Sequence, residues 1–119
     1  MNNDLNKYNY KRGEVFKIDF SDDNFIDHEQ QGNRLGVIIQ NDKGNKHCGN
    51  VIIALASSKR KSSPTHFSIS DNKTDRPTTI MTEHIRTVSK RRLYEYVCTL
   101  DADEMKVLDE KLKLSLSLQ

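Results

Sequence analysis

Residues 14–20 read EVFKIDF, and the alternation within this stretch decides the class of fold. Phe16, Ile18 and Phe20 occupy every second position, with charged side chains between them. Because successive side chains of a β-strand point to opposite faces, this pattern predicts a strand with one face buried and the other in water. The fold therefore starts from a sheet.

Further segments continue the sheet along the chain. They are short, apolar and in part β-branched, as strands often are, and they lie at residues 35–39, 51–56, 66–69, 80–88 and 96–100. Turn-forming residues 41–45 separate the first two, and a basic turn at residues 90–92 precedes the last.

After residue 100 the period changes to that of a helix. Asp101 stands three residues before Glu104, as in a capping box, and apolar residues then recur on one helical face: Met105, Leu108, Leu112 and Leu116. The sequence thus predicts a mainly β fold with α, in which a C-terminal helix packs on a small, strongly curved antiparallel sheet. We expect a loose polar lead-in at residues 1–10 and a single domain at residues 11–119.

The composition is typical of a soluble globular protein. Of the 119 residues, 30% are charged and 34% hydrophobic, and no apolar run approaches the roughly 20 residues of a membrane span. Cys48 and Cys98 are far apart and no secretory leader is evident, so we expect reduced thiols and a cytoplasmic location. His47 beside Cys48 lacks a second pair of ligands at metal-binding spacing, so we expect neither a metal site nor a cofactor.

Two polar connections carry the candidate chemistry. Residues 21–33 are too polar to be buried and too long for a tight hairpin, and long loops in small domains usually carry function. This loop ends at Arg34, at the start of one central strand, while the next central strand ends at Ser57. If the two strands are neighbours, a guanidinium and a hydroxyl lie side by side at the same end of the sheet.

The positive charges form two clusters, although the formal net charge is only +2. One consists of Lys59, Arg60 and Lys61, directly after the Ser57 strand, and the other occupies residues 90–92. Either can touch a phosphate backbone if it lies beside a groove, but a single basic triplet is more often a solvated turn. Both interpretations stay open at this point.

Several segments together resemble one known family. They read RGEV at residues 12–15, HEQQGNR at 28–34, VIIQND at 37–42, PTH at 64–66 and EHIRTV at 83–88, with residues 92–93 and 114–116 behind them. In this order and spacing they are similar to the MazF/PemK toxins over nearly the whole chain. The resemblance implies an SH3-like barrel with a C-terminal helix, acting as a homodimer. It also implies the toxin of a type II toxin–antitoxin system, paired with a small antitoxin and cleaving single-stranded messenger RNA at short sequences.

The resemblance also assigns the catalytic residues. Arg34 matches the family's catalytic arginine, and Ser57 falls where the family carries its catalytic threonine or serine. RNA supplies its own nucleophile in the 2′-hydroxyl, so cleavage to a 2′,3′-cyclic phosphate needs orientation, proton transfer and charge stabilisation but no metal. The arginine fork donates two directed hydrogen bonds to phosphate oxygens, and the serine hydroxyl can donate to a third.

Candidate RNA-binding residues surround this pair, either in the polar loops or in the segments that carry the resemblance: His28, Glu29, Gln30, Asn33, Lys59, Pro64, Glu83 and His84. His28, Glu29 and His84 are also candidates for proton transfer. The opposite interpretation is that His28 is a solvated loop residue and that His84 packs between strands.

The chain departs from the family pattern at a few positions. Leu35 replaces the proline that usually follows the arginine, His84 replaces a common glutamine, and Gln31 with Asn33 replaces a more glycine-rich loop. The first change is expected to loosen the presentation of Arg34, and the others leave the target sequence open. Two alternatives therefore remain: a barrel that binds without cutting, as the gyrase-targeting CcdB-type toxins do, and a toxin that has lost its activity.

Overall fold

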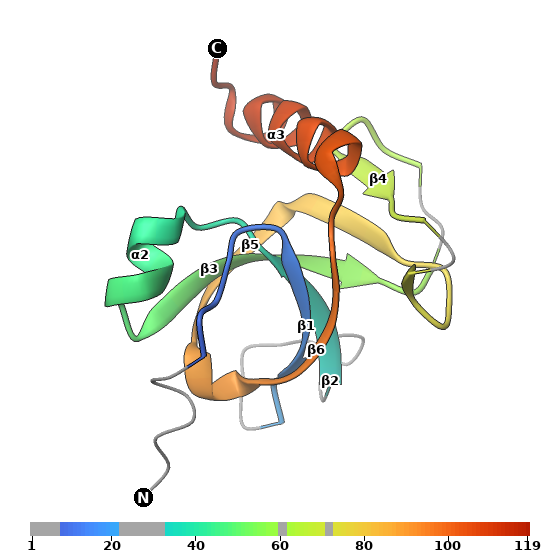
Figure 1. Ribbon diagram of the computed structural model, residues 1–119. Coiled ribbons are helices and arrows are strands. Elements are labelled where there is room, and N and C mark those ends of the chain that lie inside the picture. The colour runs from blue at the N-terminus through green and yellow to red at the C-terminus, as the bar shows by residue number, and fades with distance from the viewer. Residues whose placement is uncertain (1–7, 22–32, 60–61, 71–72) are drawn as a thin grey trace, which may run out of the picture.

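A curved antiparallel sheet makes up most of the molecule. The computed structural model describes residues 8–21, 33–59, 62–70 and 73–119. Its six strands are β1 (Glu14–Asp19), β2 (Asn33–Ile38), β3 (Asn50–Ser57), β4 (His66–Ser68), β5 (Thr79–Ser89) and β6 (Leu93–Thr99), in the sheet order β4-β5-β3-β2-β1-β6. In Figure 1 the sheet curls until β1 and β6 lie across from β3 and β5. The expected mainly β fold and the expected strand segments are confirmed.

The two faces of the curled sheet bury two separate cores. Phe16, Ile18 and Phe20 are all buried, as their alternation predicts, in a cluster whose members come from strands around the sheet, so this cluster fills the interior. Gly36 lies at its centre, where an added Cβ would stand 2.6 Å from Cδ1 of Ile18 and 3.2 Å from Cδ1 of Ile53. A larger residue at that position would therefore force the end of the Ile18 side chain to move.

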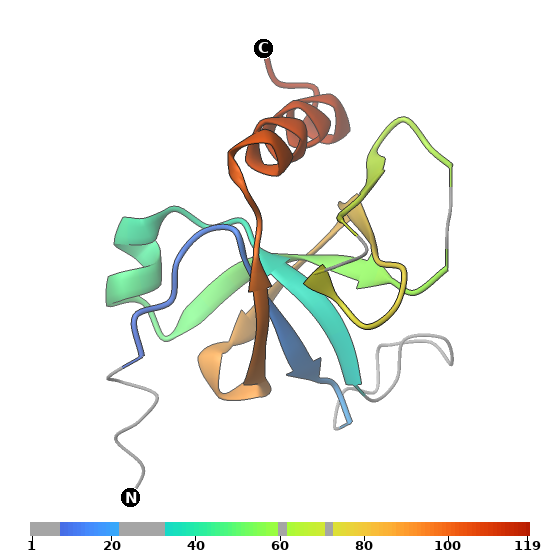
Figure 2. The ribbon, with the colours of Figure 1, turned by 45° about the vertical axis from the view of Figure 1, so that its right-hand side comes forward.

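The second core lies under the C-terminal helix α3 (Ala102–Leu116), into which β6 leads directly (Figure 2). The capping box predicted for Asp101 and Glu104 is present, and Leu108 and Leu112 are buried. The prediction that Leu116 shares this face is wrong, because its side chain is 51% exposed. Ser115 faces the sheet instead, with its Oγ 2.6 Å from Oγ1 of Thr82, and the next residue is turned away by the helical rotation.

The connection between β2 and β3 differs from the predicted turn. It forms a short helix, α2 (Asp42–His47), because the Asn41 side chain accepts a hydrogen bond from the Gly44 amide and caps it. The basic turn is a 3-10 helix, η3 (Lys90–Arg92). Tyr10, at the end of the expected lead-in, is buried in the interior core. Within the described ranges, no helix has both the length and the apolar character needed to cross a membrane.

Candidate active site

Arg34 and Ser57 lie on neighbouring strands at the same level of the sheet. The register of β2 and β3 pairs Gly36 with Leu55 and Val37 with Ala54. Continued by two residues toward the strand ends, it sets Arg34 across from Ser57, and residues directly opposite share one face. The Arg34 Nη2 atom donates a hydrogen bond of 2.8 Å to the carbonyl oxygen of Ala56. The guanidinium is thus fixed beside the residue that precedes Ser57.

The Ser57 hydroxyl is already oriented by the backbone that follows it. Its Oγ accepts a hydrogen bond of 3.1 Å from the amide of Lys59, and the side chain is half-buried at the end of β3. Because the oxygen is the acceptor in this bond, the hydroxyl hydrogen can still be donated to a ligand. Beside it, Lys59 is exposed. This arrangement suits the binding of a phosphate group.

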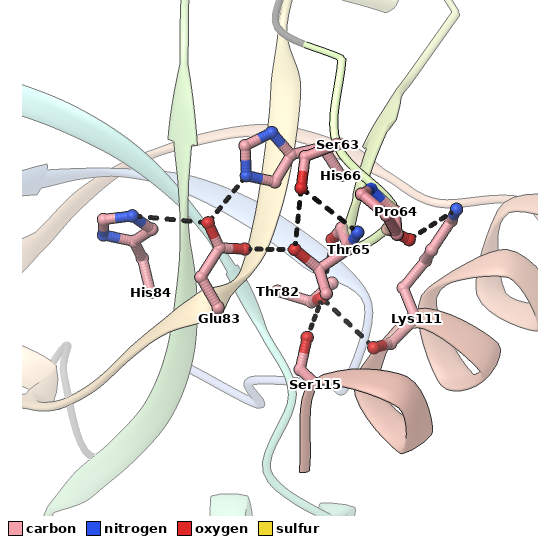
Figure 3. Close-up of polar contacts among 9 residues, drawn as sticks. All are labelled: Ser63, Pro64, Thr65, His66, Thr82, Glu83, His84, Lys111 and Ser115. Atoms are coloured by element: carbon pink, nitrogen blue, oxygen red, sulfur yellow. Dashed lines mark hydrogen bonds and ion pairs between the residues drawn. The ribbon is translucent and has the colours of Figure 1, made fainter. Parts of the chain in front are cut away.

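A second polar group centres on the carboxylate of Glu83 (Figure 3). Its Oε1 accepts a hydrogen bond of 2.7 Å from Thr65 Oγ1, and its Oε2 lies 2.7 Å from His66 Nε2. His84 Nε2 stands 3.5 Å from the same Oε2. Burial raises the pKa of Glu83, but the hydrogen bonds from His66 and Thr65 outweigh this effect and lower the pKa to about 2. The carboxylate is therefore ionised at neutral pH.

An irregularity in β5 brings these residues together. Ala54 of β3 pairs with Ile85, whereas Ala56 pairs with Ile80, so residues 81–84 of β5 bulge out of the ladder. Bulges redirect side chains and are frequent beside functional sites. On the other edge of β5, β4 pairs His66 with Met81, which brings the preceding loop within reach of Glu83.

The predicted site residues thus fall into two groups and a remainder. Arg34, Ser57 and Lys59 form the first group; Glu83 and His84 belong to the second, next to Pro64. His28, Glu29 and Gln30 lie outside the described residues, and so does the side chain of Asn33, whose backbone begins β2. Sequence reasoning missed Thr65 and His66 as partners of Glu83. The available signal was their position in the PTH segment, where a hydroxyl and an imidazole follow one another.

Comparison with known proteins identifies the family. Residues 11–116 match the model of the PemK-like, MazF-like toxins of type II toxin–antitoxin systems. The chain belongs to this family. It is 37% identical over 112 residues to the endoribonuclease EndoA of Bacillus subtilis (strain 168), a match that covers 91% of this chain and 95% of that protein.

Solved structures of the family share the fold. MazF from Deinococcus radiodurans (Form-I) superposes with a TM-score of 0.78 at 20% identity, covering 93% of this chain and 99% of that one. An endoribonuclease in complex with its cognate antitoxin, from Mycobacterial species, gives a TM-score of 0.78 at 20% identity and covers 92% of this chain and 97% of its own. The SH3-like barrel expected for a MazF/PemK toxin is confirmed.

One departure of this MazF/PemK toxin from the family pattern is Leu35, and the structure shows where its side chain lies. Leu35, in place of the usual proline, packs partly buried against the core beneath α3, while the neighbouring Arg34 donates its hydrogen bond to Ala56.

The basic cluster at residues 90–92 binds backbone carbonyl groups of the protein: Lys90 Nζ donates to the Asn45 carbonyl and Arg92 Nη1 to the Asp19 carbonyl. These two cations therefore stabilise the fold. Arg60 and Lys61 lie outside the described residues.

Proposed function

We propose that this toxin is an endoribonuclease that cleaves single-stranded messenger RNA without a metal ion, with Arg34 and Ser57 as its catalytic pair. The observation that carries the proposal is the hydrogen bond from Arg34 Nη2 to the Ala56 carbonyl, which holds the guanidinium next to Ser57. A cation and a hydroxyl donor side by side match the needs of a phosphoryl group that gains charge during reaction.

The chemistry uses the RNA's own nucleophile. The 2′-oxygen attacks the adjacent phosphorus and loses its proton, and the 5′-oxygen of the next nucleotide leaves and takes up a proton. The products are a 2′,3′-cyclic phosphate and a 5′-hydroxyl. Arg34 donates hydrogen bonds to the phosphate oxygens as their charge rises, and Ser57 donates to another of them. Three residues are candidates for proton transfer: His84, which lies among the described residues, and His28 and Glu29, which are candidates from the sequence alone.

The RNA path runs from the catalytic pair along the loop that follows Ser57. Lys59 is exposed directly beyond the pair and suits a backbone phosphate. Pro64 is exposed near the far end of the loop, and the His84 side chain is 41% exposed on the bulge of β5. We propose that these residues contact the RNA strand, and that Gln30 of the long loop and Asn33 at the start of β2 bind base edges, together with His28 and Glu29.

The toxin acts in the cytoplasm as a homodimer and is neutralised by a cognate antitoxin that occupies the RNA-binding surface. Membership of a type II toxin–antitoxin family supports the antitoxin as a partner. The solved mycobacterial endoribonuclease of the same fold was captured with such a partner. Among the described residues, we find no specific feature in favour of the alternative function, a barrel that targets gyrase without cutting RNA.

The test is cleavage of a long RNA of mixed sequence by purified protein in the presence of a chelator, with the cut ends mapped. We expect cuts that leave a 2′,3′-cyclic phosphate, and we expect Arg34→Ala to slow them by about 10²–10³-fold. Unchanged cleavage by Arg34→Ala would exclude the catalytic role of the arginine. Growth arrest with intact transcripts would instead support the gyrase-type alternative.

A further inference from the structure

Glu83 was a candidate for direct contact with RNA, but its carboxylate is already engaged within the protein. Thr65 donates to Oε1 and His66 lies against Oε2, both at 2.7 Å. We infer that Glu83 is a positioning residue, which holds the end of the loop after Ser57 and does not select the bases of the RNA. This inference rests on the proposed ribonuclease activity.

The loop concerned begins at the catalytic hydroxyl and ends at the Glu83 partners. At its start, Ser57 Oγ accepts from the Lys59 amide. At its end, the Thr65 hydroxyl and the His66 ring are tied to the carboxylate, eighteen and seventeen residues away in sequence. Ordering a loop costs conformational entropy for every residue fixed, so contacts that hold both ends reduce what RNA binding must supply.

The same loop end is held from a second direction by β5 and α3. The Thr82 amide and hydroxyl both donate to the Thr65 carbonyl oxygen, at 3.2 and 2.6 Å. Lys111 Nζ of α3 donates to the Pro64 carbonyl at 2.8 Å. Glu83 binds the side chains of Thr65 and His66, while Thr82 and Lys111 bind backbone carbonyl groups. The end of the loop is therefore fixed on the body of the protein (Figure 3).

The Glu83 side chain is itself 40% exposed, and it is the burial of its partner His66 that favours an internal role for their contact. The His66 side chain is only 8% exposed, and its Nδ1 is buried without a hydrogen-bond partner among the described residues. The contact with Glu83 is then the polar anchor of this ring, because its other nitrogen has none. Losing the anchor would leave a buried imidazole with neither nitrogen paired, which is costly.

Glu83 also touches the residue that we place against the RNA. His84 Nε2 stands 3.5 Å from Glu83 Oε2, and the two side chains come from adjacent positions on the β5 bulge. His84 is the residue that departs from the common glutamine of the family. On this basis we assign the selection of RNA bases to His84 and the support of the loop end to Glu83. The two roles give different results in a cleavage assay.

The decisive experiment maps and times the cuts that wild-type, Glu83→Gln and His84→Gln proteins make in one mixed RNA. For Glu83→Gln we expect the same set of cut sequences, each cut with kcat/KM lower by about tenfold, the scale of one lost charge-assisted hydrogen bond. For His84→Gln we expect a changed set of cut sequences. A changed set in Glu83→Gln would overturn the positioning role, and so would an unchanged kcat/KM. Wild-type protein that leaves RNA uncut would contradict the proposed function itself.

Two further measurements separate positioning from simple loss of fold. Thr65→Val removes one donor to Glu83, so the double variant with Glu83→Gln should be little slower than the worse single variant. Thr87→Val, an exposed threonine on the same strand, is the matched control and should cleave normally. In nitrogen NMR, the His66 Nε2 signal should move in Glu83→Gln and stay in place in Thr87→Val. Fully multiplicative losses, or a His66 signal unmoved by Glu83→Gln, would contradict the inference.

Discussion

Ser57 and Ser58 are chemically identical neighbours in different positions. Ser57 is half-buried at the end of β3 and fixed by the Lys59 amide, whereas Ser58 is exposed. Removing one preorganised donor to a reacting phosphate typically lowers the rate by about 10²–10³. We therefore expect Ser57→Ala to lower kcat on that scale and Ser58→Ala to leave it unchanged, measured on one RNA at saturating concentration. Equal effects of the two substitutions would rule out a special role for Ser57.

The lowered pKa of Glu83 predicts how the free energy of unfolding depends on pH. Its pKa is about 2 in the folded protein, below the ordinary 4.5. A carboxyl group whose pKa is lower in the folded state stabilises the protein above its unfolded pKa, and this contribution is lost as the pH falls through the folded pKa. We expect the free energy of unfolding to decline from about pH 4.5 toward pH 2, and to decline less in Glu83→Gln.

The measurement is denaturant unfolding of both proteins across this pH range. Other carboxylates also titrate there, so only the difference between the two curves reports on Glu83. Glu95→Gln is a suitable control, since Glu95 makes an exposed ion pair of 3.4 Å with Lys17. Parallel curves for wild type and Glu83→Gln would show that the carboxylate contributes nothing through its ionisation.

Among the elements, α3 has one face buried against the sheet and another face exposed to solvent. Leu108 is completely buried against the sheet, while Leu114 is 55% exposed. We expect Leu108→Ala to lower the free energy of unfolding by about 2–5 kcal/mol, because it leaves a cavity, and Leu114→Ala by less than about 0.5 kcal/mol. The midpoints of denaturant unfolding give both values. A large loss in Leu114→Ala would mean that this side chain is buried in solution, for instance between two copies of the chain.

The sequence predicts elements well where a repeated pattern reaches across several residues. The alternation around Phe16 predicts β1, and the Asp101–Glu104 spacing predicts the start of α3. The helix α2 could not be predicted in this way, because its sequence, DKGNKH, has no apolar period and contains a glycine. Its helical state depends on the Asn41 cap and on the buried Asn45 side chain, which donates to the Gln40 carbonyl.

At the scale of the whole molecule, the two parts of the site differ in how far the sequence predicts them. Arg34 and Ser57 meet if two consecutive central strands are neighbours, which is the usual arrangement. The contacts of Thr65 and His66 with Glu83 depend on the pairing of the short β4 with β5 and on the bulge of β5. No local pattern reports a bulge, so the family resemblance marked these residues without giving their contacts.

At the scale of the whole molecule, we propose that the guanidinium of Arg34 and the hydroxyl of Ser57 act on the same phosphate, which makes their coupling measurable. Wild type, Arg34→Ala, Ser57→Ala and the double variant can be compared on one short RNA with a single cut site, with kcat measured for each. Residues that act as a unit give losses that do not multiply. We expect each single variant to lose about 10²–10³ in kcat and the double variant to lose far less than the product of the two. Wild-type kcat in either single variant, or losses that multiply in full, would contradict a shared phosphate.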